Sequence, residues 1–215
     1  MKLLSINIGK AQQQQRKDYV ETTGIYKMPM DGPIEIKSLG IEGDAVCDTK
    51  HHGGPDQALY IYGSADYAWW SQELDRELAP GTFGDNLTIS ELESAQFNVG
   101  DYLHIGEIIL QVTSPRIPCG TFATRMGDPQ WVKKFRAAER PGLYVRVVKE
   151  GIIKAGDEVM VEKYTGETVS ILQMYRDHYA KEYTGESLRR YLNSPIDFRS
   201  RKDFEEELQK TLVTE

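Results

Sequence analysis

The feature that most constrains the fold of this chain is a series of short, β-branched apolar runs separated by turns that contain glycine. Residues 102–105 and 108–112 are two such runs, and residues 143–148 and 152–153 are two more. Glycine reaches positive φ without a steric cost, so each pair of runs predicts a β-hairpin. Their recurrence through about residue 165 favours an all-β barrel or sandwich over a βαβ sheet.

The charge balance and the hydropathy narrow the kinds of partner. Lys and Arg total 26 against 33 Asp and Glu, and the formal net charge of −7 argues against nucleic-acid binding. No apolar run approaches the roughly 18 to 20 residues that a bilayer requires, so no membrane partner is expected. Alternating Leu4, Ile6 and Ile8 predict a first strand rather than a signal peptide. We therefore expect a cytoplasmic protein in which Cys47 and Cys119 stay reduced.

One helix stands out inside this β region. Ser64 is a candidate N-cap, and Trp70, Leu74 and Leu78 recur at four-residue spacing after it. The aromatic stripe of this helix, which includes Tyr67 and Trp70, is interpreted as core packing rather than as a chemical site.

The composition changes after residue 165. Three segments without glycine or proline show partial helical periodicity, at residues 168–179, 186–193 and 200–213. In the last of them Phe204, Leu208 and Leu212 form an apolar stripe. A unit of about three short helices hardly folds alone, so we expect it to pack on the β region or on a partner. A homodimer contact through this stripe is one such arrangement.

The first candidate site is the segment His-Gly-Gly-Pro-Asp at residues 52–56. The paired glycines Gly53 and Gly54 let the main chain approach a ligand and aim its N–H groups at an anion, beside the imidazole of His52. Asp56 can accept hydrogen bonds from backbone or imidazole N–H groups. The alternative is a structural turn whose histidines lie on the surface.

The second candidate site is Ser-Pro-Arg-Ile-Pro-Cys at residues 114–119, directly after the apolar run 108–112. Its two prolines fix φ on either side of Arg116 and predict a rigid exit from a strand, where ligand-binding groups are common. A cation three residues before Cys119 lowers the pKa of the thiol and favours the thiolate, which ligates metals or attacks electrophiles. The alternative is a buried, inert cysteine.

Four pieces of this sequence together resemble a known family. They are Gly-Ile-Glu-Gly-Asp (40–44), His-Gly-Gly-Pro-Asp-Gln-Ala-Leu (52–59), Phe-Gly-Asp-Asn-Leu (83–87) and Ser-Pro-Arg-Ile-Pro-Cys (114–119). In this order they resemble the MOSC domain, named for the carboxy-terminal part of molybdenum cofactor sulfurases. Within it, the chain is similar to the YiiM-like bacterial proteins linked to resistance against 6-N-hydroxylaminopurine. The resemblance implies a mainly β fold, with a MOSC-type β-barrel and a few inserted helices over residues 1–165 and a three-helix unit over residues 166–215.

The resemblance also implies a cofactor site. Family members bind molybdenum cofactor through one protein cysteine, which by motif match is Cys119, and a soft thiolate suits this redox-active metal. The guanidinium of Arg116 would grip the pterin phosphate or tune the thiolate, and His52 would form the opposite wall. The expected cofactor-binding residues are Arg116, Gly53, Gly54, Asp56, Asn86 and Ser114.

The activity that the resemblance implies is the two-electron reduction of N-hydroxylated compounds, such as N-hydroxylaminopurine bases, to amines, which would contribute to detoxification. His52 is the candidate proton donor, because the ordinary pKa of histidine lies near neutrality. Electrons would come from a separate flavin-type reductase. Pyridoxal phosphate is not expected, because in the sulfurases it belongs to a separate aminotransferase-like domain.

Three other interpretations stay open. The chain could be a non-catalytic carrier of molybdenum cofactor or of sulfur on Cys119, or a regulatory protein that uses its helical tail as a contact surface. A zinc site could form from Cys47, His51, His52 and Cys119, although the spacing Cys-x3-His matches no common structural zinc pattern. The roles of Cys47 and His51 are not assigned.

Overall fold

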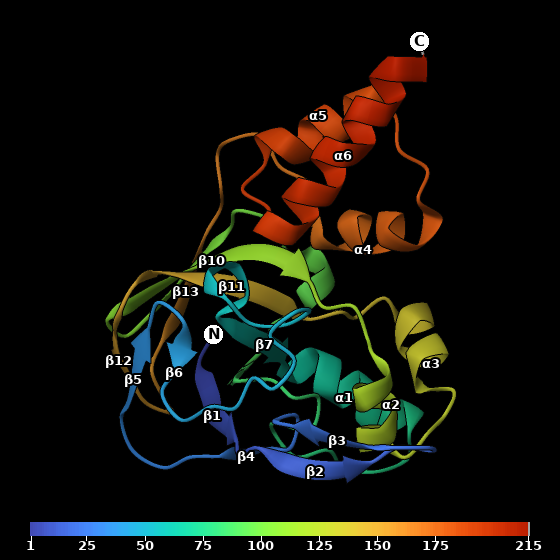
Figure 1. Ribbon diagram of the computed structural model, residues 1–215. Helices are drawn as coiled ribbons and strands as arrows, with labels where there is room; N and C mark the ends of the chain where they lie inside the picture. The colour runs from blue at the N-terminus through green and yellow to red at the C-terminus, as the bar shows by residue number, and fades with distance from the viewer. Residues whose placement is uncertain (215) are drawn as a thin grey trace.

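The computed structural model describes residues 1–214, with side chains described through residue 211 (Figure 1). The side chain of Leu212, the last member of the predicted stripe, and Glu215, the end of the predicted helical unit, lie outside this part of the chain. The strands are β1 (Leu3–Gly9), β2 (Gln12–Gln15), β3 (Val20–Thr23), β4 (Lys27–Pro29), β5 (Ile34–Lys37), β6 (Gly40–Ile41), β7 (Leu59–Gly63), β8 (Leu87–Ile89), β9 (Tyr102–Ile105), β10 (Ile108–Pro115), β11 (Leu143–Lys149), β12 (Gly151–Ile153) and β13 (Val159–Glu162). The helices are α1 (Ser64–Glu73), α2 (Gly120–Met126), α3 (Trp131–Ala138), α4 (Ile171–Ala180), α5 (Gly185–Asn193) and α6 (Phe198–Thr214), with short 3-10 turns at Pro55–Gln57 and Ser94–Gln96.

An eight-stranded mixed sheet forms the frame, in the order β13-β9-β10-β11-β7-β8-β1-β4. The pair β7–β8 is parallel and the other neighbours are antiparallel. The sheet curls until Lys2 and Glu158 form an isolated bridge, but within residues 1–214 its edge strands β13 and β4 do not pair. The predicted barrel is therefore wrong in two respects: the sheet is open, and helices make the fold mixed α/β rather than mainly β. The physical reason for the mixed topology is a βαβ unit, since parallel β7 and β8 need a crossover and α1 lies in it.

The hairpin predictions have mixed outcomes. The hairpin of β9 and β10 is confirmed, but β12 pairs with β5 in a separate three-stranded sheet instead of returning along β11. The first strand is also confirmed, although Leu3 is buried and Leu4 is exposed. A register shift between Leu3 and Ser5, where β1 pairs with β8, breaks the simple alternation that the sequence suggested.

Helices α1, α2 and α3 enclose an aromatic core. Helix α1 is confirmed, but Gly63 is its N-cap and it ends at Glu73, before Leu78. Helices α2 and α3 have no counterpart among the elements located along the sequence. The buried side chains of this core are Ile25, Tyr60, Tyr62, Tyr67, Trp70, Phe83, Phe122, Met126, Trp131, Phe135 and Tyr144. This packing confirms that the aromatic stripe of α1 belongs to the core.

The three predicted tail helices are present as α4, α5 and α6. Figure 1 shows them grouped at one end of the molecule, next to β10 and β11. Ile171, Leu188 and Phe204 share one hydrophobic core with strand residues of the sheet such as Leu110. The tail therefore packs on the β region, and a domain boundary at residue 165 stays a prediction. Among residues 1–214, none of the helices combines the length and the hydropathy that a membrane span requires.

Candidate active site

Two cavities meet beside Cys119. The small cavity, of about 170 Å³, lies against segments 21–25 and 44–48 and reaches Arg116. The large cavity, of about 600 Å³, lies between the 114–119 segment and helices α4 and α6. Both are lined by Asp48, His52, Gln57, Cys119 and Tyr144. A group held at this shared wall is therefore accessible from either side.

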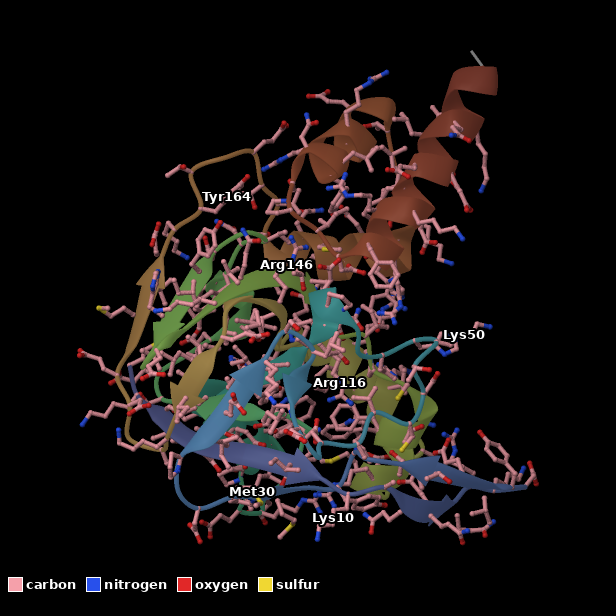
Figure 2. The ribbon with its side chains drawn as sticks, turned by 60° about the vertical axis from the view of Figure 1, so that its left-hand side comes forward. Lys10, Met30, Lys50, Arg116, Arg146 and Tyr164 are labelled. Atoms are coloured by element: carbon pink, nitrogen blue, oxygen red, sulfur yellow. The ribbon has the colours of Figure 1, made fainter. Side chains whose placement is uncertain are left out.

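The structure brings most of the predicted site residues together. The small cavity is lined by Cys119, His52, Gly53, Arg116 and Asn86, whereas Ser114 lines only the large cavity and Gly54 and Asp56 line neither. In Figure 2 Arg116 lies in the interior of the molecule, while Lys50 marks the outer tip of the loop that carries His52. Two segments more than 60 residues apart in sequence thus form one wall.

The Cys119 thiol is tuned toward ionisation. Cys119 follows the proline-rigidified end of β10 and is the N-cap residue of α2. Burial opposes ionisation of this thiol. The thiolate is favoured by the side chains of His52 and Arg116 and by the backbone N–H of Phe122, and the net effect lowers the pKa of Cys119 to about 6. The predicted effect of a nearby cation on this thiol is present, and at neutral pH the thiolate is the major form.

Arg116 is a buried cation without a carboxylate partner. Its side chain is 5% exposed, and its guanidinium carbon lies 4.6 Å from the ring centres of both Tyr60 and Phe122. One nitrogen donates to the carbonyl of Phe83, while Nε is buried and has no hydrogen-bond partner. No ion pair of Arg116 is present among the described residues. A buried, unpaired cation is costly unless an anion faces it, and the thiolate of Cys119 is the anion at hand.

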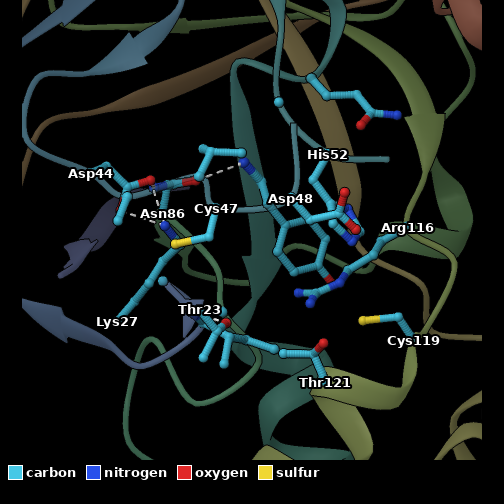
Figure 3. Close-up of a pocket in the computed structure, with 18 of the residues that line it drawn as sticks. Thr23, Lys27, Asp44, Cys47, Asp48, His52, Asn86, Arg116, Cys119 and Thr121 are labelled. Carbon is cyan, nitrogen blue, oxygen red and sulfur yellow. Dashed lines mark hydrogen bonds and ion pairs between the residues drawn. The ribbon is translucent and has the colours of Figure 1, made fainter. Parts of the chain in front are cut away.

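Figure 3 shows the sulfur of Cys119 directed toward Arg116, with Cys47 across the small cavity on the side of Lys27 and Asp44. Cys47 is exposed, and partial desolvation together with the charge of Asp44 raises its pKa, in the opposite sense to Cys119.

No group of three or more His, Cys, Asp or Glu side chains that could hold a metal ion occurs in the part of the chain that the structure describes. The zinc interpretation therefore finds no support in the described residues.

Asn86 organises the cavity rather than offering free polar atoms. Its Nδ2 donates to Asp44 at 2.9 Å, and its Oδ1 accepts from the backbone N–H of Tyr60 at 3.1 Å. Asp44 also forms a nearly buried ion pair with Lys27. Asp44 ends the Gly-Ile-Glu-Gly-Asp motif, so its place in the site could have been predicted from the sequence. Lys27, on a short strand outside the motifs, could not.

Three predicted ligand residues have other surroundings. Asp56 accepts from the backbone N–H of Phe198 at 2.8 Å and lies 3.0 Å from Arg146, so it anchors the helical tail instead of lining a cavity. Gly54 has a positive φ of 87° beside the ring of Phe198. Ser114 is buried in the wall of the large cavity, and its Oγ has no hydrogen-bond partner.

His52 and His51 differ in environment. The Nδ1 of His52 lies 3.3 Å from the hydroxyl of Tyr144, at the shared wall. His51 is exposed, and its Nδ1 lies 2.9 Å from a carboxylate oxygen of Asp48. Tyr144 completes this wall, although in the sequence it is distinguished only by its place in an apolar run.

The two cysteines are expected to react over different pH ranges. In the cofactor-free protein, alkylation of Cys119 by iodoacetamide should rise with pH around a midpoint near 6, because the thiolate is the nucleophile. Alkylation of Cys47 should rise only at a pH above the ordinary range of a cysteine, because its pKa is raised. Peptide mass spectrometry after timed labelling from acid to alkaline pH measures both profiles. Coinciding profiles would contradict the proposed tuning.

Comparison with known proteins defines the class of this protein. Residues 48–160, which contain all the residues shared by the walls of the two cavities, match the MOSC domain. The chain belongs to the MOSC domain family, which is associated with molybdenum cofactor binding.

Three relatives of known sequence extend this result. The chain is 33% identical over 184 residues to the uncharacterized protein YflK of Bacillus subtilis, a match that covers 85% of this chain and 83% of YflK. It is 38% identical over 101 residues to protein YiiM of Escherichia coli, covering 45% of each. It is 30% identical over 159 residues to a reductase of Gibberella moniliformis, covering 72% of this chain but only 28% of the fungal protein.

Solved structures show the same fold. YiiM from Geobacillus stearothermophilus superposes with a TM-score of 0.77 at 24% identity, over 96% of this chain and 98% of that one. YiiM from Escherichia coli superposes with a TM-score of 0.73 at 21% identity, over 100% of this chain and 94% of that one. The protein is thus a YiiM-like member of the MOSC family, with an open mixed sheet and helices rather than a closed barrel.

Proposed function

We propose that this protein is a molybdenum-cofactor-dependent reductase of N-hydroxylated compounds. It would convert R–NH–OH, two electrons and two protons into R–NH₂ and water, and so remove toxic N-hydroxylated bases such as N-hydroxylaminopurines. The observation that carries the proposal is the low-pKa thiol of Cys119 beside the buried, unpaired cation of Arg116, where two cavities meet.

The residues present fit the cofactor. Cys119 offers the soft thiolate that binds molybdenum, and Arg116, which lines the small cavity and has no carboxylate partner, offers a cation for an anionic group. Gly53 and residues of segments 22–24 and 45–47 line the small cavity, and the backbone N–H and C=O groups of such segments suit the edge of a pterin. When bound, the cofactor supplies a two-electron redox centre.

The protein's own contribution is to position the substrate and move a proton. The large cavity opens onto the shared wall, so a substrate there can bring its N–O bond next to Cys119. His52 lies at that wall and donates the proton that the departing hydroxyl needs. The hydroxyl of Tyr144 lies 3.3 Å from the Nδ1 of His52 and orients its ring. The electrons come from a separate flavin-type reductase.

A non-catalytic carrier of molybdenum cofactor or sulfur on Cys119 is the alternative function. The large cavity favours the enzyme, since a carrier needs an accessible thiol but no chamber beside it. The two functions differ in whether bound molybdenum is accompanied by turnover.

The deciding experiment expresses the protein in cells that make molybdenum cofactor. Molybdenum per chain is measured by elemental analysis, and the chemically reduced protein is assayed with 6-N-hydroxylaminopurine and other N-hydroxy compounds. Near-stoichiometric molybdenum with turnover supports the reductase, and molybdenum without turnover on any of these compounds supports the carrier. Molybdenum-free protein containing zinc would refute both.

A further inference from the structure

Arg199, near the start of α6, holds the loop that carries His52. Its guanidinium donates to four carbonyl oxygens of this loop. The distances are 3.2 Å from Nε to Lys50, 3.0 Å from Nη1 to Gly53, and 3.2 Å and 3.4 Å from Nη2 to Thr49 and His52. A guanidinium has five N–H donors in a rigid fork, so nearly all of its hydrogen-bonding capacity is directed at one short segment.

Apart from Arg199, the loop is ordered by short-range contacts of His51 and His52 with Asp48 and by the contact of His52 with Tyr144. The side chains of Thr49, Lys50 and His51 are exposed, and Gly53 and Gly54 both have positive φ. Within the loop, the backbone N–H of His52 donates to the carbonyl of Asp48 at 3.0 Å. A segment with exposed side chains and few internal contacts opens readily unless a neighbouring element holds it.

The chain just before Arg199 is fixed to the sheet independently. The backbone N–H of Phe198 donates to Asp56, and Arg146 donates to the carbonyls of Pro195 and Ile196 at 3.1 and 3.0 Å. Figure 2 shows Arg146 directly below the helical tail. Arg199 therefore projects toward the loop from a fixed support.

We propose that Arg199 is a positioning residue that fixes segment 49–53 and thereby holds the imidazole of His52 at the wall between the two cavities. The C-terminal helical unit then contributes directly to the order of the active site. The effect on loop order rests on the contacts above, whereas the effect on turnover rests on the proposed function.

The chain offers a matched control. Arg201, two residues further along α6, also donates to two carbonyls, those of Leu192 at 2.7 Å and Ser194 at 2.8 Å, but both belong to the tail. R201A removes an arginine and its carbonyl contacts without touching the His52 loop. R199K keeps the positive charge, but a single ammonium group cannot reproduce a fork that spans four carbonyls.

The first test is backbone hydrogen exchange of the full-length, cofactor-free protein, followed by mass spectrometry. Within segment 49–53, the amides of His51 and His52 donate to Asp48, and their exchange should become about tenfold or more faster in R199A and in R199K, because loop opening is no longer opposed. R201A should leave this segment unchanged. Thermal melts of each variant verify that the rest of the fold is intact. Wild-type exchange of segment 49–53 in R199A would overturn the proposal.

The second test uses turnover by the molybdenum-loaded protein. R199A should lower kcat by about tenfold with little change in molybdenum content, since a proton donor is misplaced. Arg199 also lines the large cavity, so R199K, which keeps a cation there, should show the same loss of kcat even where the KM of R199A changes. In an H52Q background R199A should cause no further loss, because Arg199 acts through His52. An equal loss in both backgrounds would overturn the positioning role. If the wild-type protein shows no turnover, the proposed function fails, and the exchange experiment alone decides whether Arg199 fixes the loop.

Discussion

The C119A variant is expected to lose bound molybdenum and turnover together. Its thiol is the soft ligand at the junction of the cavities, and alanine leaves no protein atom that can replace it. We expect kcat/KM to fall by at least ~10³-fold, the scale on which removal of a group essential to the chemistry is measured. C119S should behave like C119A, because a hydroxyl does not ionise near neutral pH and is a hard ligand. Elemental analysis and the N-hydroxy reduction assay measure both losses.

C47A is the matched control for this result. Cys47 also lines the small cavity, but it lies across from Arg116 and its pKa is raised. We expect C47A to retain the molybdenum content and turnover of the wild-type protein. Loss of molybdenum in C47A would show that the wrong cysteine has been assigned as the ligand. Wild-type molybdenum content in C119A would refute the proposed cofactor site.

The part of the site that is local in sequence was predictable. Arg116 and Cys119 are three residues apart between fixed prolines, so their proximity follows from chain geometry alone. His52 was recognisable from its glycine-rich turn. The contact between these two segments was predicted only from the family resemblance. In the structure it results from the pairing of both β7 and β10 with β11, and residue spacing does not reveal such long-range pairing.

Other site residues carried no local signal. Tyr144 and Arg199 reach the site from elements about 90 and 150 residues away from His52 along the chain. Asp56 was predicted to bind the cofactor because it lies in the motif, but this prediction was wrong. Its carboxylate instead pairs with Arg146 of β11 and accepts from the backbone at the start of α6. The choice of partner for such a side chain is made by tertiary packing, which the spacing of residues in sequence does not contain.

The fold was predictable where pattern and turn chemistry agree. The β9–β10 hairpin and the tail helices follow from hydrophobic periodicity and glycine placement. Helices α2 and α3 have seven and eight residues, too few for a clear helical period, so neither was located. The parallel pair β7–β8 was missed because short apolar strands look alike whether their partner runs parallel or antiparallel. That pair makes the sheet mixed rather than antiparallel.

Replacing Arg116 by methionine is expected to separate function from stability. Methionine retains much of the volume that packs on Tyr60 and Phe122, but it removes the buried cation. The pKa of Cys119 should rise from about 6 toward the ordinary range of a cysteine, and molybdenum content should fall by about tenfold or more. The free energy of unfolding of the cofactor-free protein should change by less than about 1 kcal/mol, because removing a buried, unpaired cation offsets the lost hydrogen bond to the Phe83 carbonyl. The alkylation profile, elemental analysis and denaturant titration measure these three quantities.

R140M is the control for R116M, because it removes an arginine that pairs with a buried carboxylate outside the site. Arg140 pairs at 2.7 Å with Asp66, a fully buried carboxylate, and lies over the ring of Trp69. Removing this arginine leaves a buried charge uncompensated, so we expect a loss of about 2–3 kcal/mol in the free energy of unfolding and no change in the Cys119 profile. A structural arginine is therefore expected to affect stability alone, and a ligand-binding arginine to affect the thiol and the cofactor alone. If R116M destabilised the protein as much as R140M while leaving the thiol unchanged, Arg116 would be a structural residue and the anion site would have to lie elsewhere.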